Sequence, residues 1–259
     1  MTYSTVATGA TPELVVYLID ISGSMSQQVD GAPKIEHVNA AVKSVIQRMI
    51  KRSTKGRIIA PRYRLCIGCY SDTVTDILPG IRTIAEVATQ GAPHLSTLAT
   101  TDTAAAFRWA RDILKAEIPK LDGCPAPMVC HLTDGEYTGA DPEPVAAEIM
   151  AMSTADGNVL VENIYVGDHL TNHPITDPMK WEGINDESEL ASSPYVHKLF
   201  RMSSSLPQSY ANVIREENYS MRAGARMLIP ASNKALIELA FAMSGATPVV
   251  EKQTATTTA

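Results

Sequence analysis

Residues 13–24 read Glu-Leu-Val-Val-Tyr-Leu-Ile-Asp-Ile-Ser-Gly-Ser, and this stretch decides both the fold and the place of its chemistry. The apolar run at 14–19 is typical of a strand that is buried on both faces of a parallel sheet. The strand ends at Asp20, and oxygen-bearing side chains then stand on alternate residues, at Asp20, Ser22 and Ser24. We expect a tight turn that points all three oxygens at one position.

Apolar patterns further along the chain alternate between those of helices and those of strands. Residues 34–49 carry apolar side chains three and four positions apart, which predicts an amphipathic helix lying on one face of a sheet. The elements predicted after it are a strand at 63–70, a short antiparallel edge strand at 72–78, a helix at 103–118, a strand at 127–132, a helix at 142–152 and a strand at 159–166. This order predicts a doubly wound α/β fold, with a mostly parallel central sheet, one antiparallel edge strand and helices on both faces.

The last third of the chain is less regular. Residues 167–194 lack periodicity and are rich in His, Pro, Asp, Asn and Ser, so we expect an insertion or long loop there. The elements predicted beyond it are a last strand at 198–202, a short helix at 207–219, an extended stretch at 227–230 and a closing helix at 234–243. We therefore expect a flexible N-terminus at 1–12, a single domain at 13–250 and a flexible tail at 251–259.

The composition limits the classes of partner. The chain has 259 residues and a net charge of −6, and its Lys and Arg residues are mostly scattered, which argues against a nucleic-acid surface. No apolar run reaches the roughly 18 residues of a membrane span, and residues 1–12 lack the layout of a signal peptide. We therefore expect a cytoplasmic protein that contacts neither nucleic acid nor membrane. The four cysteines fit a reducing compartment in which disulfides are not needed.

Two further segments supply oxygen donors that the fold would bring near Asp20. Thr101 stands just before the predicted helix at 103–118, and Asp134 follows the predicted strand at 127–132, where Gly135 permits a turn. In open α/β sheets, ligands bind beyond the carboxyl ends of the strands, which is where both aspartates fall. Carboxylates and hydroxyls suit Mg2+, a hard cation that takes about six oxygen ligands and often keeps several waters.

The sequence therefore predicts a metal site without catalytic residues, in which Mn2+ or Ca2+ remain alternatives to Mg2+. Its predicted ligands are Asp20, Ser22, Ser24, Thr101 and Asp134.

The pattern Asp20-x-Ser22-x-Ser24, followed by Thr101 before a helix and by Asp134-Gly135, resembles in order and spacing the metal-ion-dependent adhesion site (MIDAS) of von Willebrand factor A (VWA) domains. The resemblance covers roughly residues 13–166 well, and the closing elements more loosely. It implies a three-layer, Rossmann-like VWA fold. It also implies that the two serines and the threonine bind the metal, that the aspartates bond waters or serine hydroxyls, and that an Asp or Glu carboxylate of a protein partner completes the shell.

Two features depart from the family pattern. Ala99-Thr100 stands where the family often has Gly-Gly or Gly-x before its threonine, and the segment at 167–194 has no place in a minimal domain. The missing secretion signal and the short flanks look like bacterial cytosolic members, such as those of tellurium-resistance and stress-response operons. This likeness implies an intracellular scaffold or stress-response component.

Two other functions remain as alternatives. A phosphatase of the haloacid dehalogenase class also begins with an Asp after a buried strand and uses Mg2+, but Ser22 stands where that class has its acid/base carboxylate. A structural assembly subunit with a vestigial metal site is the third possibility. We expect an interaction module rather than an enzyme.

Several residues are expected to have purely structural roles. At least one of Asp102 and Thr103 should cap the helix that follows. The six histidines are expected at the surface, and Trp181 is expected to pin its own loop to the body of the domain.

Overall fold

The computed structural model describes residues 2–29, 31–97, 101–167 and 169–245, so the predicted tail at 251–259 lies outside the described residues. Its sheet has seven strands in the order β11-β10-β9-β1-β6-β7, and β8 also pairs with β6. The strands are β1 (Glu13–Asp20), β6 (Tyr63–Tyr70), β7 (Val74–Asp76), β8 (Arg82–Thr83), β9 (Met128–Thr133), β10 (Leu160–Tyr165) and β11 (Leu228–Pro230).

The sheet is mostly parallel. Strands β1, β6, β9, β10 and β11 pair in parallel, whereas β7 and the two-residue β8 run antiparallel to β6 at one edge. The mostly parallel sheet and the antiparallel edge strand predicted at 72–78 are both confirmed, and β8 is a short addition to that edge.

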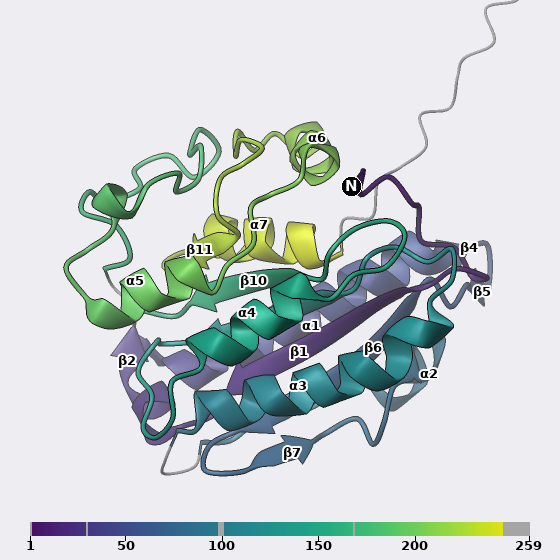
Figure 1. Cartoon of the computed structure of the whole chain (residues 1–259), viewed down its shortest axis with the longest axis horizontal. Coiled ribbons are helices and arrows are strands. Elements are labelled where there is room, and N and C mark those ends of the chain that lie inside the picture. The colour runs from purple at the N-terminus through teal and green to yellow at the C-terminus, as the bar shows by residue number, and fades with distance from the viewer. Residues whose placement is uncertain (1, 30, 98–100, 168, 246–259) are drawn as a thin grey trace, which may run out of the picture.

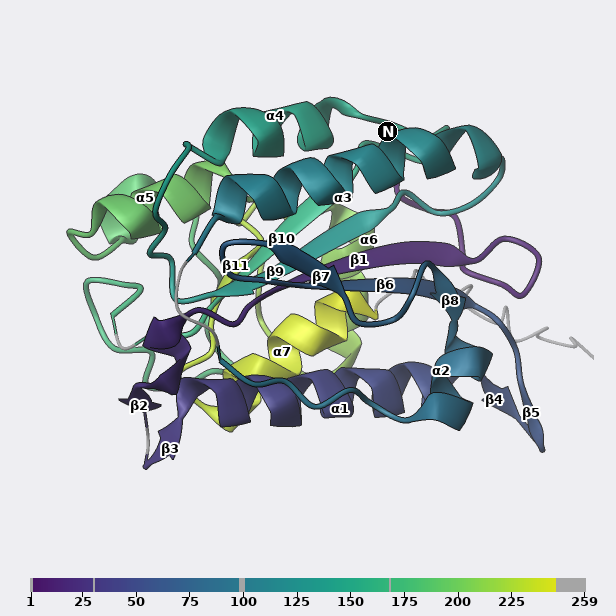
Figure 2. The same cartoon turned by 90° about the horizontal axis from the view of Figure 1, so that it is seen from below.

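Helices cover both faces of the sheet, as Figures 1 and 2 show. On one face lie α3 (Thr103–Glu117) and α4 (Glu143–Ala151), and on the other lie α1 (Lys34–Ser53), α2 (Ile84–Gln90) and α7 (Lys234–Ser244). Each face buries its own apolar cluster: Leu14, Val16 and Leu18 pack toward α3 and α4, whereas Val15, Tyr17 and Ile19 pack toward α1 and α7. The apolar run of β1 is therefore buried on both sides, as its sequence predicts.

The predicted strand at 198–202 is wrong. Residues Pro194–Arg201 form helix α5, and the last strand of the sheet is β11, within the stretch predicted as extended at 227–230. Pro194 at the first helical position is compatible with a helix start, and Val196, Leu199 and Phe200 lie on one buried face. Helix α6 (Gln208–Glu216) forms as predicted within 207–219.

The segment before α5 is a long loop with the short 3-10 helix η3 (Glu187–Glu189) and isolated bridges such as Thr171 with Leu190. Trp181 packs against buried apolar residues of this loop and of the body, which confirms that it pins its own segment. At the other end of the chain, the backbone N–H groups of Ser4 and Thr5 donate to Asp156 over 2.9 Å. The division into one domain with flexible ends stays a prediction.

No helix in the described ranges is long and apolar enough to span a membrane. The four cysteines are all buried and free. Cys66 packs with the cluster under α3 and Cys69 with the cluster under α1, on opposite faces of the sheet.

Candidate metal centre

The candidate site begins at the end of β1, where the strand order reverses between β1 and β9. The register pairs Ile19 with Leu132, so Asp20 and Thr133 come next to each other on adjacent strands. Thr133 donates its hydroxyl to Oδ2 of Asp20 over 3.0 Å, and the backbone N–H of Ser22 donates to Oδ1 over 2.9 Å. Both bonds fix the Asp20 carboxylate at the point where open α/β sheets bind ligands.

The turn after Asp20 gathers the serine hydroxyls. The 3-10 helix η1 (Gly23–Ser26) starts directly after Ser22, and this turn places Oγ of Ser22 3.0 Å from Oγ of Ser24. Ser22 is buried, and Ser24 is partly exposed. The turn therefore brings the two serine hydroxyls together next to Asp20.

Asp134 lies at the end of the neighbouring strand, β9. It follows β9 directly, and Gly135 has a φ of 89°, the left-handed conformation that favours glycine. The Asp134 residue is only 6% exposed. Its Oδ2 lies 3.2 Å from Nζ of Lys34, whereas its Oδ1 is buried and has no hydrogen-bond partner among the described residues.

Thr101 lies at the same edge of the sheet. It is buried, and its carbonyl accepts from the backbone N–H and the hydroxyl of Thr138, over 2.9 and 2.8 Å. The next residue, Asp102, donates its N–H to the carbonyl of Ser71 just past β6. Its side chain accepts from the N–H of Ala105 over 2.8 Å and so caps α3, as predicted. Thr101 is thus held between the loops that follow β6 and β9.

The two carboxylates share one electrostatic environment. Burial raises the pKa of Asp20 to about 6, the negative charge of Asp134 adds to the rise, and hydrogen bonds from Ser22 and Thr133 oppose it. Two negative carboxylates in one buried place repel each other, and a cation between them relieves that repulsion.

The residues present fit a hard divalent cation. The described residues contain no group of three or more His, Cys, Asp or Glu that could hold a metal, so this site depends on hydroxyls beside its carboxylates. Such an all-oxygen donor set is the kind that Mg2+ prefers. The buried Oδ1 of Asp134 is an acceptor for which the described part of the chain supplies no donor.

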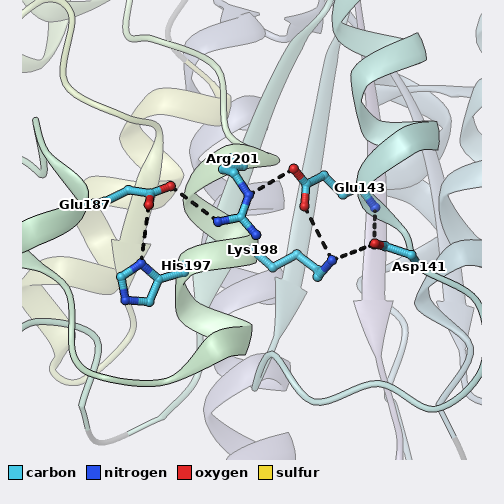
Figure 3. A network of polar contacts seen from close by, with 6 residues as sticks. All are labelled: Asp141, Glu143, Glu187, His197, Lys198 and Arg201. Carbon is cyan, nitrogen blue, oxygen red and sulfur yellow. Dashed lines mark hydrogen bonds and ion pairs between the residues drawn. The ribbon is translucent and has the colours of Figure 1, made fainter.

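Helix α5 holds the loop that follows Asp134, as Figure 3 shows. Lys198 lies 2.7 Å from Asp141 and 3.4 Å from Glu143, the first residue of α4. Arg201 pairs with the same Glu143 over 2.9 Å and with Glu187 over 3.4 Å. These ion pairs connect α5 to the end of the loop between β9 and α4, which contains Asp134, and to the long loop before α5.

Sequence reasoning missed two features near the site. One is Lys34, which contacts Asp134 across 100 positions of sequence. The only local signal is a lysine at the first position of a helix, where the positive end of the helix dipole disfavours a cation.

The other is a buried chain of polar side chains centred on His131, for which the predicted surface position is wrong. His131 is fully buried, and its Nε2 lies 2.6 Å from the Tyr70 hydroxyl. Its Nδ1 lies 2.7 Å from Oδ1 of Asn163, whose Nδ2 donates to Oγ of Ser203 over 2.9 Å and to the carbonyl of Met202 over 3.2 Å. Because an amide oxygen only accepts, Nδ1 of His131 carries the proton, and Tyr70 donates to Nε2. Burial lowers the pKa of His131 to about 4, consistent with a neutral ring.

Comparison with known proteins shows likeness in structure only. No family model matches this sequence, and no curated protein matches it. Among solved structures, proximal thread matrix protein 1 (PTMP1) from the mussel byssus has a TM-score of 0.50 and 13% identity, over 90% of this chain and 46% of that chain. This chain therefore spans less than half the length of PTMP1.

Two further structures are similar to parts of the chain. The SpRpn10 VWA domain has a TM-score of 0.48 and 14% identity, over 88% of this chain and 93% of that one. PTMP1 with a zinc-occupied MIDAS motif has a TM-score of 0.43 and 18% identity, over 63% of this chain and 38% of that one. The sheet order described above, with helices on both faces, makes a three-layer, Rossmann-like α/β fold.

Proposed function

We propose that this protein is an interaction module that binds a divalent cation, with Mg2+ as the first candidate. Through this cation it would bind a carboxylate of a protein partner. The ligands proposed are Asp20, Ser22, Ser24, Thr101 and Asp134. The observation that carries the proposal is the pair of buried carboxylates at the switch point of the sheet, where Oδ1 of Asp134 has no partner in the part of the chain that the structure describes.

Each residue of the site has a task that follows from its contacts. Ser22 and Thr133 hold the Asp20 carboxylate through one hydrogen bond to each oxygen. The hydroxyls of Ser22 and Ser24 lie 3.0 Å apart, and that of Ser22 is within hydrogen-bonding reach of the same carboxylate. A hard divalent cation bound there supplies a Lewis-acidic position that an Asp or Glu carboxylate can fill. Metal and partner should then enhance each other's binding, because each stabilises the state that the other prefers.

The resemblance to cytosolic VWA proteins supports a finer placement within this proposal. The protein would work in the bacterial cytoplasm as a scaffold or stress-response component of the tellurium-resistance type, without catalysis of its own. Ser22 takes the place where a haloacid dehalogenase phosphatase needs a proton donor, which favours binding over hydrolysis. Mg2+-dependent hydrolysis of a generic phosphate ester, abolished in Asp20→Asn, would reverse this preference.

The experiment is a pull-down with the purified chain as bait, in Mg2+ and in chelator. We expect a partner that is retained in Mg2+ and lost both in chelator and with the folded variant Asp20→Ala. The matched control is Asp112→Ala, which removes an exposed carboxylate from α3 and should retain the partner. A partner that binds equally well in chelator contradicts a metal-dependent interaction.

A further inference from the structure

Lys34 is the one cation that the structure pairs with a proposed ligand of the metal centre in the described ranges. Its Nζ lies 3.2 Å from Oδ2 of Asp134, with side chains that are 11% and 4% exposed. The same Nζ lies 3.3 Å from Oε1 of Gln27. A two-stranded hairpin, β2 (Gln28–Val29) and β3 (Ala32–Pro33), brings Lys34 back beside the serine turn.

Apart from its contacts with Asp134 and Gln27, Lys34 lies in a place that is unfavourable for a cation. It is the first residue of α1, at the positive end of the helix dipole, and its ammonium is removed from most of the solvent. The buried carboxylate of Asp134 offsets both costs. Lys34 therefore depends on the same negative charge that a metal at this site would use.

Formal charges show how Lys34 changes the net charge of the site with and without a metal. Asp20 and Asp134 contribute two negative charges and Lys34 one positive charge, so the metal-free site carries one net negative charge. A divalent cation changes this to one net positive charge, which a single carboxylate from a partner would neutralise. Without Lys34 the loaded site would already be neutral, and its attraction for an anion would be weaker.

The surroundings of Lys34 leave room for its ammonium to move. A pocket of about 450 Å3 opens beside the site, and Gln27, Lys34, Asp134, Glu136, Tyr165 and Ser193 are among its lining residues. A lysine carries its ammonium on a flexible four-carbon chain, so the ammonium can leave Asp134 and stay within this pocket.

We propose that Lys34 is a tethered cation that competes with the metal for Asp134, and that metal binding displaces its ammonium into the adjoining pocket. In this way Lys34 lowers the affinity for the metal and makes the loaded site more attractive to an anion. The inference rests on the proposed metal site and deepens it.

The test is isothermal titration of chelator-stripped protein with Mn2+, comparing the wild type with Lys34→Gln. Two like charges a few ångströms apart repel strongly at a partly buried site, so we expect Lys34→Gln to bind Mn2+ about tenfold or more tightly than the wild type. Lys34→Arg, which keeps the charge, should stay near the wild type. Lys43→Gln removes an exposed charge from the same helix and should change nothing.

The possible outcomes distinguish the role of Lys34 from the existence of the metal site. Equal or weaker Mn2+ binding by Lys34→Gln overturns the role of Lys34 and leaves the metal site standing. No binding by either protein overturns the metal site and the inference with it. Binding by Lys34→Gln alone supports both.

A second measurement uses the wild-type protein and so does not depend on the folding of a variant. Brief acetylation with acetic anhydride, read by peptide mass spectrometry, should label Lys34 severalfold more in Mg2+ than in chelator, because its ammonium leaves Asp134. Labelling of Lys43 serves as the internal reference. Labelling of Lys34 that is unchanged or reduced by Mg2+ contradicts the displacement.

Discussion

Thr133 donates its hydroxyl to Oδ2 of Asp20 over 3.0 Å and so joins the end of β9 to the end of β1 at the candidate metal centre. Oγ1 of Thr133 also accepts from the backbone N–H of Gly135 over 2.9 Å. One side chain thus orients the first aspartate of the site and the turn that carries the second.

Replacing Thr133 by Val should therefore damage the fold and the site together. The change leaves Oδ2 of Asp20 and the N–H of Gly135 without these partners in a buried place, which should lower the free energy of unfolding by about 1–3 kcal/mol. Urea denaturation measures this, and Mn2+ titration should show weaker binding. Thr89→Val, on the exposed face of α2, is the control and should change stability by less than about 0.5 kcal/mol. Equal stabilities for Thr133→Val and the wild type would contradict this role.

Asn163 should be important for stability through its contacts with His131 and the end of α5. Asn163→Leu leaves the Nδ1 proton of His131 without an acceptor and removes the donor to Ser203. We expect a loss of about 3 kcal/mol in unfolding free energy, measured by chemical denaturation. Asn212→Leu on the exposed side of α6 should be nearly neutral. A loss no larger than that of the control would show that the buried polar chain contributes little.

Gly135 and Gly139 form a matched pair in the loop between β9 and α4, which contains Asp134. Both have positive φ, 89° and 98°, so alanine should cost about 1–2 kcal/mol at either position. Only at Gly135 would the new Cβ also meet neighbours, at 3.3 Å from Tyr165 and 3.4 Å from Leu199 and Tyr195. Gly135→Ala should therefore be the less stable variant by denaturation, and it alone should bind Mn2+ more weakly. Indistinguishable variants would mean that α5 does not position Asp134.

Glu13, fully buried at the start of β1, should make stability depend on pH. Burial raises the pKa of Glu13 from 4.5 to about 8, while a hydrogen bond with Tyr210 and nearby arginines oppose the rise. Between these values the unfolded chain loses the proton and the native protein keeps it, so the stabilisation present below pH 4.5 is lost as the pH rises toward 8.

The pH effect is best measured between pH 6.5 and 8, above the ordinary pKa of histidine. Unfolding free energy of the wild type should fall there more steeply than that of Glu13→Gln, by up to about 1.4 kcal/mol per pH unit. Denaturant titrations of both proteins at several pH values give the two slopes. Parallel slopes would show that Glu13 is ionised in the native protein.

The sequence predicts the central sheet well because its strands carry continuous apolar runs. It predicts the gathering of Asp20 and Asp134 because parallel strands end at one edge. The strand predicted at 198–202 failed because a short apolar run cannot distinguish a strand from one buried face of a helix. The buried position of His131 was missed since a strand covered on both faces buries polar residues as well. Lys34 could not be predicted, because its contact depends on a hairpin that folds it back over the site.

The most direct test of the account is calorimetric titration of chelator-stripped protein with Mg2+ and Mn2+, with circular dichroism to verify each fold. We predict saturable binding by the wild type and by Asp112→Ala, and its loss in both Asp20→Ala and Ser22→Ala. Binding that survives in folded Asp20→Ala, or no binding by the wild type at millimolar metal, would contradict the claim that this edge of the sheet is a metal centre.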